Sequence, residues 1–162
     1  MAPGTTRITA EPGTQQIEIT REFDAPPELL FRAHIEPELV VQWLGPRNLT
    51  MMVDRLDARD GGTWRYTHRD ADGNAFAFHG VFHGTPSVYG IVRTFEFEGA
   101  PGHISLETAS FERVGNRTLL RQRAVFQAVA DRDAMIQSGM ESGVNESMER
   151  LHELVARMAP GH

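Results

Sequence analysis

The chain has 162 residues, a hydrophobic fraction of 40% and a net charge of −6, which together fit a single globular domain. It contains no cysteine and no lysine, so disulfides, thiolate nucleophiles and side-chain Schiff bases are excluded. The arginines are scattered rather than clustered, and we therefore expect no nucleic-acid partner. Because no apolar run approaches the roughly 18 residues that span a bilayer and no secretory signal is visible, we expect a cytoplasmic protein without a membrane partner.

The first elements follow a Pro-, Gly- and Thr-rich segment, residues 1–14, which we expect to be a flexible N-terminal tail. Residues 15–159 then form the predicted single domain. Residues 15–23 alternate with period two, which predicts a strand. Two short helices are predicted over residues 24–35 and 37–44, because each opens on prolines and the second ends at Gly-Pro.

Six further strands are predicted at regular intervals, separated by short Gly-, Asn-, Asp- and Pro-containing turns. Turns this short favour antiparallel neighbours. The predicted strands cover residues 49–56, 62–68, 75–83, 91–98, 103–113 and 117–129.

The last segment, residues 131–158, predicts one long amphipathic helix with a continuous apolar face. Gly139 and Gly143 lie inside it, and two interior glycines suggest that the sheet or a ligand approaches the helix backbone closely. The helix has the length to cover one face of the sheet. A strongly curved antiparallel sheet wrapped around it would leave a gap between the two. The apolar face comprises Met140, Val144, Met148, Leu151, Val155 and Met158.

Two histidines four residues apart, His79 and His83, raise the question of a metal site. The surrounding phenylalanines alternate with period two, which predicts a strand rather than a helix. On a strand the two histidines lie about 13 Å apart, too far for one metal with ligand bonds of about 2 Å. We therefore expect no metal here, and nothing in the sequence points to a cofactor.

Several segments taken together resemble the family named for the activator of the heat-shock protein 90 ATPase. These are "REFDAPPELLFRAHIEPELVVQWLGP", "ARDGGTWRY", "DADGNAFAFHGVF", "NRTLLRQ" and "GMESGVNESMERLHELVA", spread from about Ile17 to Ala156. The family belongs to the START-like, SRPBCC superfamily. The resemblance implies an α+β helix-grip fold, in which a curved antiparallel sheet surrounds a long C-terminal helix over an internal cavity. Members of the superfamily bind hydrophobic small molecules, and some relatives cyclise polyketides.

One position departs from the family pattern. The family usually has a tryptophan just after the second glycine of the terminal helix, whereas this chain has Val144. A smaller side chain there can leave more open volume. Gln122 is also unusual, because it shares the strand parity of Leu120, Ala124 and Phe126 and so places an amide among core positions, where it needs a partner. The residues that we expect to line a ligand cavity are Trp64, Tyr66, Phe78, Gln122, Met140, Val144 and Met148.

The sequence contains no nucleophile elbow and no phosphate-binding loop, and its candidate acids and bases are not visibly paired. We therefore expect a carrier- or sensor-type protein that binds a hydrophobic or aromatic small molecule, without an assigned catalytic residue. Two alternatives stay open: a polyketide cyclase- or dehydratase-like enzyme, and a module that interacts with a chaperone. The chain is too short to include the additional N-terminal domain of the co-chaperone, which argues against the second. A homodimer through an edge strand is compatible with the sequence. The candidate acids and bases are Tyr66, His68, His79 and Glu107.

Overall fold

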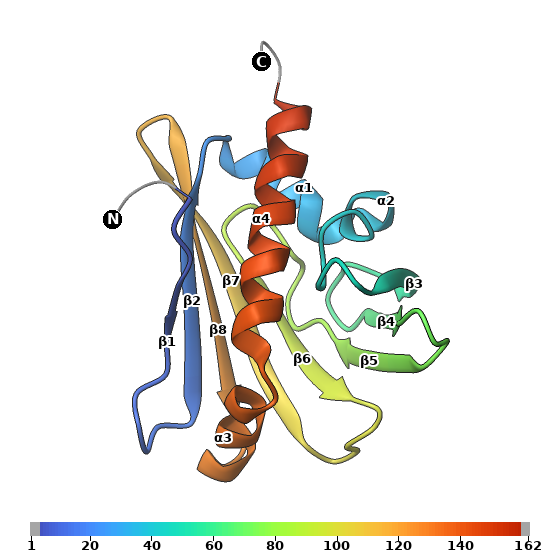
Figure 1. The fold of residues 1–162 in the computed structure, drawn as a ribbon. Helices are drawn as coiled ribbons and strands as arrows, with labels where there is room; N and C mark the ends of the chain where they lie inside the picture. Colours follow the sequence, from blue (N-terminus) through green and yellow to red (C-terminus); the bar gives the residue numbers. More distant parts are fainter. Residues whose placement is uncertain (1–3, 160–162) are drawn as a thin grey trace.

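The computed structural model describes residues 4–159 and confirms the α+β helix-grip fold. Within this range, eight strands form one antiparallel sheet in the order β1-β2-β8-β7-β6-β5-β4-β3, which curves around the terminal helix (Figure 1). Each sequence-adjacent pair from β3 to β8 is also adjacent in the sheet, as the short turns predict. The strands are β1 Arg7–Thr9, β2 Gln16–Phe23, β3 Thr50–Leu56, β4 Thr63–Arg69, β5 Ala75–Val81, β6 Ile91–Phe97, β7 Ile104–Val114 and β8 Arg117–Phe126.

The helices lie on the concave side and at the two ends of the sheet. Helix α4, Met140–Met158, runs along the concave face, while α1, Pro27–Ile35, and α2, Pro37–Val40, cover its upper end in the view of Figure 1. Helix α3, Val129–Gln137, lies at the opposite end (Figure 1). None of the helices in residues 4–159 is both long and apolar enough to cross a membrane.

The core lies between the C-terminal half of α4, helix α1 and the concave face of the sheet. Leu151, Leu154 and Val155 of α4 are buried there together with Leu30 of α1. Burial of each such side chain stabilises the fold by roughly 1.5–3 kcal/mol. The apolar stripe predicted for the terminal helix is thus confirmed, because its C-terminal half forms the centre of the core.

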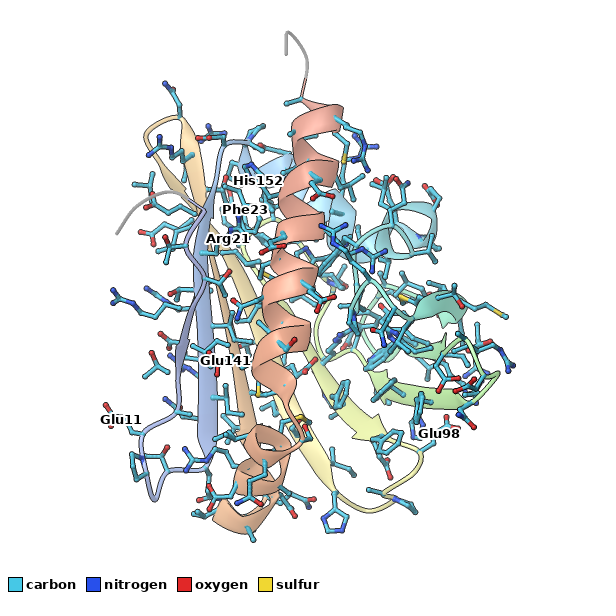
Figure 2. The ribbon with its side chains drawn as sticks, viewed as in Figure 1. Glu11, Arg21, Phe23, Glu98, Glu141 and His152 are labelled. Carbon is cyan, nitrogen blue, oxygen red and sulfur yellow. The ribbon has the colours of Figure 1, made fainter. Side chains whose placement is uncertain are left out.

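A contact between two aromatic rings joins β2 to α4 beside this core. Arg21 and Phe23 point from β2 toward His152 of α4 (Figure 2). The Arg21 guanidinium lies 5.3 Å from the Phe23 ring centroid, and the Phe23 and His152 rings are 6.4 Å apart. Burial lowers the pKa of Arg21, and the charge of Glu149 opposes this shift.

The expectation of a flexible tail over residues 1–14 is wrong for part of that segment. Residues Arg7–Thr9 pair with β2 as an edge strand. The buried Arg132 of α3 donates from Nη1 to the carbonyl oxygen of Glu11 at 2.7 Å and to Thr14 Oγ1 at 3.2 Å, which fixes the connection to β2. A strand of three residues is too short to show a period. Residues 1–3 of the expected tail lie outside the described residues.

The prediction of one helix over residues 131–158 is also wrong in one respect. The segment forms two helices, α3 and α4, because Gly139 between them adopts a left-handed conformation with φ of 87°. Gly139 is therefore the residue that precedes α4 rather than an interior position, and its φ is the conformation that only glycine adopts readily. The last predicted strand is also shorter than expected, since β8 ends at Phe126 and α3 begins at Val129.

Of the two histidines that raised the question of a metal site, His79 lies on a strand as predicted, whereas His83 lies beyond the end of that strand at Val81. His79 is on β5, on the convex face, where its ring nitrogens lie 2.9 Å from Glu98 Oε2 and 3.3 Å from Glu96 Oε1. Glu98 also accepts two hydrogen bonds from Arg65, at 2.8 and 2.9 Å (Figure 2 labels Glu98). No cluster of three or more potential metal-binding side chains occurs within the part of the chain that the structure describes.

The Glu98 network predicts a specific acid response. Hydrogen bonds from Arg65 and then from His79 lower the pKa of Glu98 to about 2. Because the folded-state pKa is below the ordinary value of 4.5, the ionised carboxylate stabilises the fold above about pH 4.5, and this contribution is lost as the pH falls toward 2. In Glu98→Gln the free energy of unfolding should therefore decline less steeply between pH 4.5 and 2 than in the wild type. Urea unfolding followed by circular dichroism at each pH measures this.

The control is Glu141→Gln, at an exposed carboxylate of α4 for which residues 4–159 provide no ion pair. Its pH profile should match that of the wild type. Identical slopes for the wild type and Glu98→Gln would contradict the assignment of acid sensitivity to Glu98.

Candidate functional site

A partly open cavity of about 350 Å³ lies between the concave face of the sheet and the N-terminal half of α4. Most of its wall is apolar. The side formed by β2, β8 and the adjoining helices is aliphatic, with Ile17, Ile19, Ala124, Met135 and Met140, and the side formed by β4 to β6 is aromatic, with Tyr66, Phe78, Phe82 and Phe95.

Helix α4 borders the cavity with several small side chains. The face of its N-terminal half presents Gly143, Val144 and Ser147 to the cavity, whereas the C-terminal half presents the buried Leu151 and Val155 to the core. A Cβ atom added at Gly143 would meet nothing within 4 Å. The close approach of another protein segment to Gly143 that two interior glycines suggested is therefore not found. Open space lies there instead.

A polar group crosses the middle of this apolar wall. Arg93 of β6 donates from Nε to Glu107 Oε1 at 3.1 Å and from Nη1 to the Tyr66 hydroxyl at 3.2 Å. Its guanidinium carbon lies 4.1 Å from the Trp64 ring centroid, a favourable cation–π distance. Burial opposes the charge, but the oxygens of Tyr66 and Glu107 outweigh it and raise the pKa of Arg93. Arg93 therefore remains a cation that is paired with one carboxylate inside the cavity.

A second polar pair lies where α1 faces β8. The His34 Nδ1 atom lies 2.7 Å from the carbonyl oxygen of Leu30, and its Nε2 atom lies 3.5 Å from Gln122 Nε2. The His34 ring packs against Trp43 and Phe111, with centroid distances of 4.9 and 5.2 Å. Burial lowers the pKa of His34 to about 4, with a smaller contribution from the charge of Arg93. His34 is therefore neutral at pH 7.

The loop that follows α2 closes one end of the cavity and is attached to α4. The Gly45 N–H donates to Ser147 Oγ at 2.8 Å, and Arg150 Nη1 donates to the Gly45 carbonyl oxygen at 2.8 Å. Gly45 has φ of 101°, and a Cβ atom there would lie 2.5 Å from the His68 ring. The Gly-Pro end of the second predicted helix is thus a tightly fitted part of the cavity rim.

Six of the seven residues that the sequence predicted for a cavity lie on its wall. These are Tyr66, Phe78, Gln122, Met140, Val144 and Met148. Trp64 is not among the lining residues: it is fully buried, and its indole N–H donates to the Thr94 carbonyl oxygen at 3.2 Å. The Arg93 guanidinium and the Tyr66 ring, both on the cavity wall, pack against the Trp64 ring. That any of the six contacts a ligand stays a prediction.

Sequence reasoning missed Arg93 and His34. Arg93 shares the strand parity of Ile91 and Phe95, so it carried the same signal that identified Gln122, namely a polar residue on an apolar face. His34 had no such signal, because its role depends on how α1 meets β8. Of the acid–base candidates, Tyr66, His68 and Glu107 line the cavity, whereas His79 lies on the convex face.

Comparison with known proteins agrees with this arrangement. Residues 24–156 match the model of the family described as "Activator of Hsp90 ATPase homolog 1-like protein". The chain belongs to this family. No curated protein matches the chain by sequence.

Solved structures similar to this member of the Hsp90 ATPase activator-like family share its fold. A protein from Rhodobacter sphaeroides is 23% identical with a TM-score of 0.86, and the match covers 94% of this chain and 99% of that one. A protein from Chromobacterium violaceum is 25% identical with a TM-score of 0.78, covering 87% and 96%. A protein from Arthrobacter aurescens is 20% identical with a TM-score of 0.85, covering 93% and 91%.

The tight fit of the cavity rim predicts that the fold is sensitive to substitution of Gly45. In Gly45→Ala the alanine must keep the left-handed φ of the glycine, and its methyl group must displace the buried His68 ring. We expect the free energy of unfolding to fall by about 2 kcal/mol or more, as measured by urea denaturation.

The matched control is Gly84→Ala. Gly84 has φ of 75°, but an added Cβ meets nothing within 4 Å, so this variant reports only the backbone cost of about 1 kcal/mol. Equal losses in the two variants would mean that the contact with His68 contributes nothing to the rim.

Proposed function

We propose that the protein binds a hydrophobic or aromatic small molecule in the cavity between the sheet and α4, as a carrier or sensor. The observation that supports this most directly is the cavity itself, with a volume of about 350 Å³ and a mostly apolar wall. Small-molecule sites commonly have volumes of about 300–1,000 Å³ and combine an apolar wall with a few polar groups. The polar groups here are Arg93 with its partners and His34 with Gln122.

The size of the cavity sets the affinity to expect. A two-ring aromatic ligand that buries ~300 Å² of apolar surface gains about 7 kcal/mol at ~25 cal/mol per Å². Association and ordering remove part of this gain. We therefore expect dissociation constants in the range of about 10 μM to 1 mM for simple aromatic probes.

One observation favours the alternative of a cyclase- or dehydratase-like enzyme. Such an enzyme needs titratable groups that converge on the cavity, and Tyr66, Arg93 and Glu107 do converge. The three are engaged with one another, however, so none is an unpaired acid or base next to open space. We therefore place this alternative second to binding. Turnover of a polyketide-like substrate that Tyr66→Phe abolishes, while substrate affinity is unchanged, would reverse the order.

Filling the cavity should abolish binding. Val144 lines the cavity in the first turns of α4, at the position where the family resemblance expects tryptophan. Val144→Trp should weaken binding of the uncharged fluorescent probe N-phenyl-1-naphthylamine at least tenfold, because the indole occupies the ligand volume. A fluorescence titration of the probe measures the dissociation constant.

The control for bulk and for added tryptophan is Val114→Trp, at an exposed position near the end of β7. This variant should bind the probe as the wild type does. Circular dichroism and thermal unfolding establish that both variants are folded. Undiminished binding by folded Val144→Trp would show that the probe does not occupy the cavity.

A further inference from the structure

The hydrogen-bonding role of His34 follows from the partner of its Nδ1 atom. The Leu30 carbonyl oxygen, 2.7 Å away, can only accept a hydrogen bond, so Nδ1 carries a proton. His34 is neutral, because burial lowers its pKa to about 4, and a neutral imidazole carries a single proton. The Nε2 atom is therefore a bare acceptor. Since Nδ1 points back to its own helix, Nε2 points away from α1 toward the sheet.

This acceptor is poorly used by the protein. Its contact is the Gln122 amide nitrogen at 3.5 Å, which is at the long limit for a hydrogen bond. The ring cannot turn easily to find a better donor, because Trp43 and Phe111 pack against it and the Leu30 contact fixes its other edge. His34 and Gln122 both line the cavity, so a guest in the cavity can contact both side chains. A buried acceptor with a weak partner gains free energy when a good donor arrives.

The charge balance of the cavity restricts which guest can supply that donor. Among the described lining residues, only Arg93, Glu107 and Arg123 carry formal charges at neutral pH. Arg93 and Glu107 form an ion pair, so their charges cancel. The Arg123 guanidinium lies 3.4 Å from Glu18 of the neighbouring strand β2. A carboxylate guest would have no unmatched positive charge to meet and would lie close to Glu107. An ammonium guest would meet Arg93. An uncharged guest avoids both penalties.

We propose that the cavity selects an uncharged aromatic or fused-ring ligand that carries a hydroxyl group, and that this hydroxyl donates its hydrogen bond to His34 Nε2. The inference rests on the proposed binding function and adds to it the chemical class of the ligand. His34 acts as a specificity-determining residue, while the apolar wall supplies most of the affinity.

Three probes of the same ring size test the proposal by isothermal titration calorimetry at pH 7. They are 2-naphthol, which is uncharged and donates, 2-methoxynaphthalene, which is uncharged and cannot donate, and 2-naphthoate, which is an anion. The wild type should bind 2-naphthol about tenfold more tightly than 2-methoxynaphthalene, as one added hydrogen bond predicts, and should bind 2-naphthoate most weakly.

Matched variants assign this preference to His34. His34→Phe keeps an aromatic ring but removes the acceptor, so it should bind 2-naphthol and 2-methoxynaphthalene with similar affinity. His34→Gln offers a side-chain oxygen and should retain a preference of several-fold. Gln122→Leu removes the weak partner of His34 Nε2 but leaves the His34 acceptor in place, so it tests whether the hydroxyl donates to His34 or contacts Gln122. Circular dichroism verifies the fold of each variant.

A measurement on the wild type covers the case in which His34→Phe fails to fold. The ¹⁵N chemical shift of the bare His34 nitrogen should move when 2-naphthol is added and should stay constant with 2-methoxynaphthalene. A constant shift with both would contradict the proposal.

The outcomes separate the two levels of inference. If both uncharged probes bind the wild type equally, or if His34→Phe keeps the preference, the role of His34 is wrong while the binding function stands. Loss of the preference in Gln122→Leu but not in His34→Phe would assign the hydroxyl to Gln122, and tightest binding of 2-naphthoate would assign the anchor to Arg93. If none of the three probes binds, the proposed function fails for aromatic ligands, and this inference fails with it.

Discussion

The structure depends on how the terminal helix meets the sheet. Large aliphatic side chains in the C-terminal half of α4 are buried in the core, whereas glycine, valine and serine in its N-terminal half line the cavity. One end of the helix therefore provides stability and the other end provides space. Because the two tasks lie on successive turns of one element, the cavity does not weaken the packing that holds the helix in place.

The polar residues of the cavity are arranged so that most of them satisfy one another. Arg93 is held by Tyr66, Glu107 and the Trp64 ring, and its charge is balanced before any guest enters. His34 differs, because its protonated nitrogen is firmly bonded and its bare nitrogen is not. The contrast distinguishes the Arg93 group, whose hydrogen bonds are made within the protein, from His34, whose bare nitrogen has only a long contact. It also explains why an apolar cavity can tolerate buried polar groups at all.

Strand periodicity predicted much of the fold and part of the wall, because side chains two apart on a strand share a face. Tyr66, Phe78 and Gln122 were found in this way. The errors arose where tertiary contacts decide the outcome. Trp64 has the right parity, yet it is fully buried under the Arg93 guanidinium and the Tyr66 ring rather than exposed on the cavity wall. Gly139 lies between α3 and α4, and the residue type alone does not distinguish a glycine between two helices from a glycine inside one.

The bond between Ser147 and Gly45 limits how this cavity can be altered in evolution or by design. Ser147 forms part of the wall, and its hydroxyl also accepts the buried N–H of Gly45. An apolar residue at this position would leave that amide without its partner, at a cost of about 1–3 kcal/mol. The neighbouring wall residues Met140 and Val144 make no side-chain hydrogen bond among the described contacts. Substitutions in the first turns of α4 can therefore reshape the cavity at little cost to stability, whereas substitutions at Ser147 cannot.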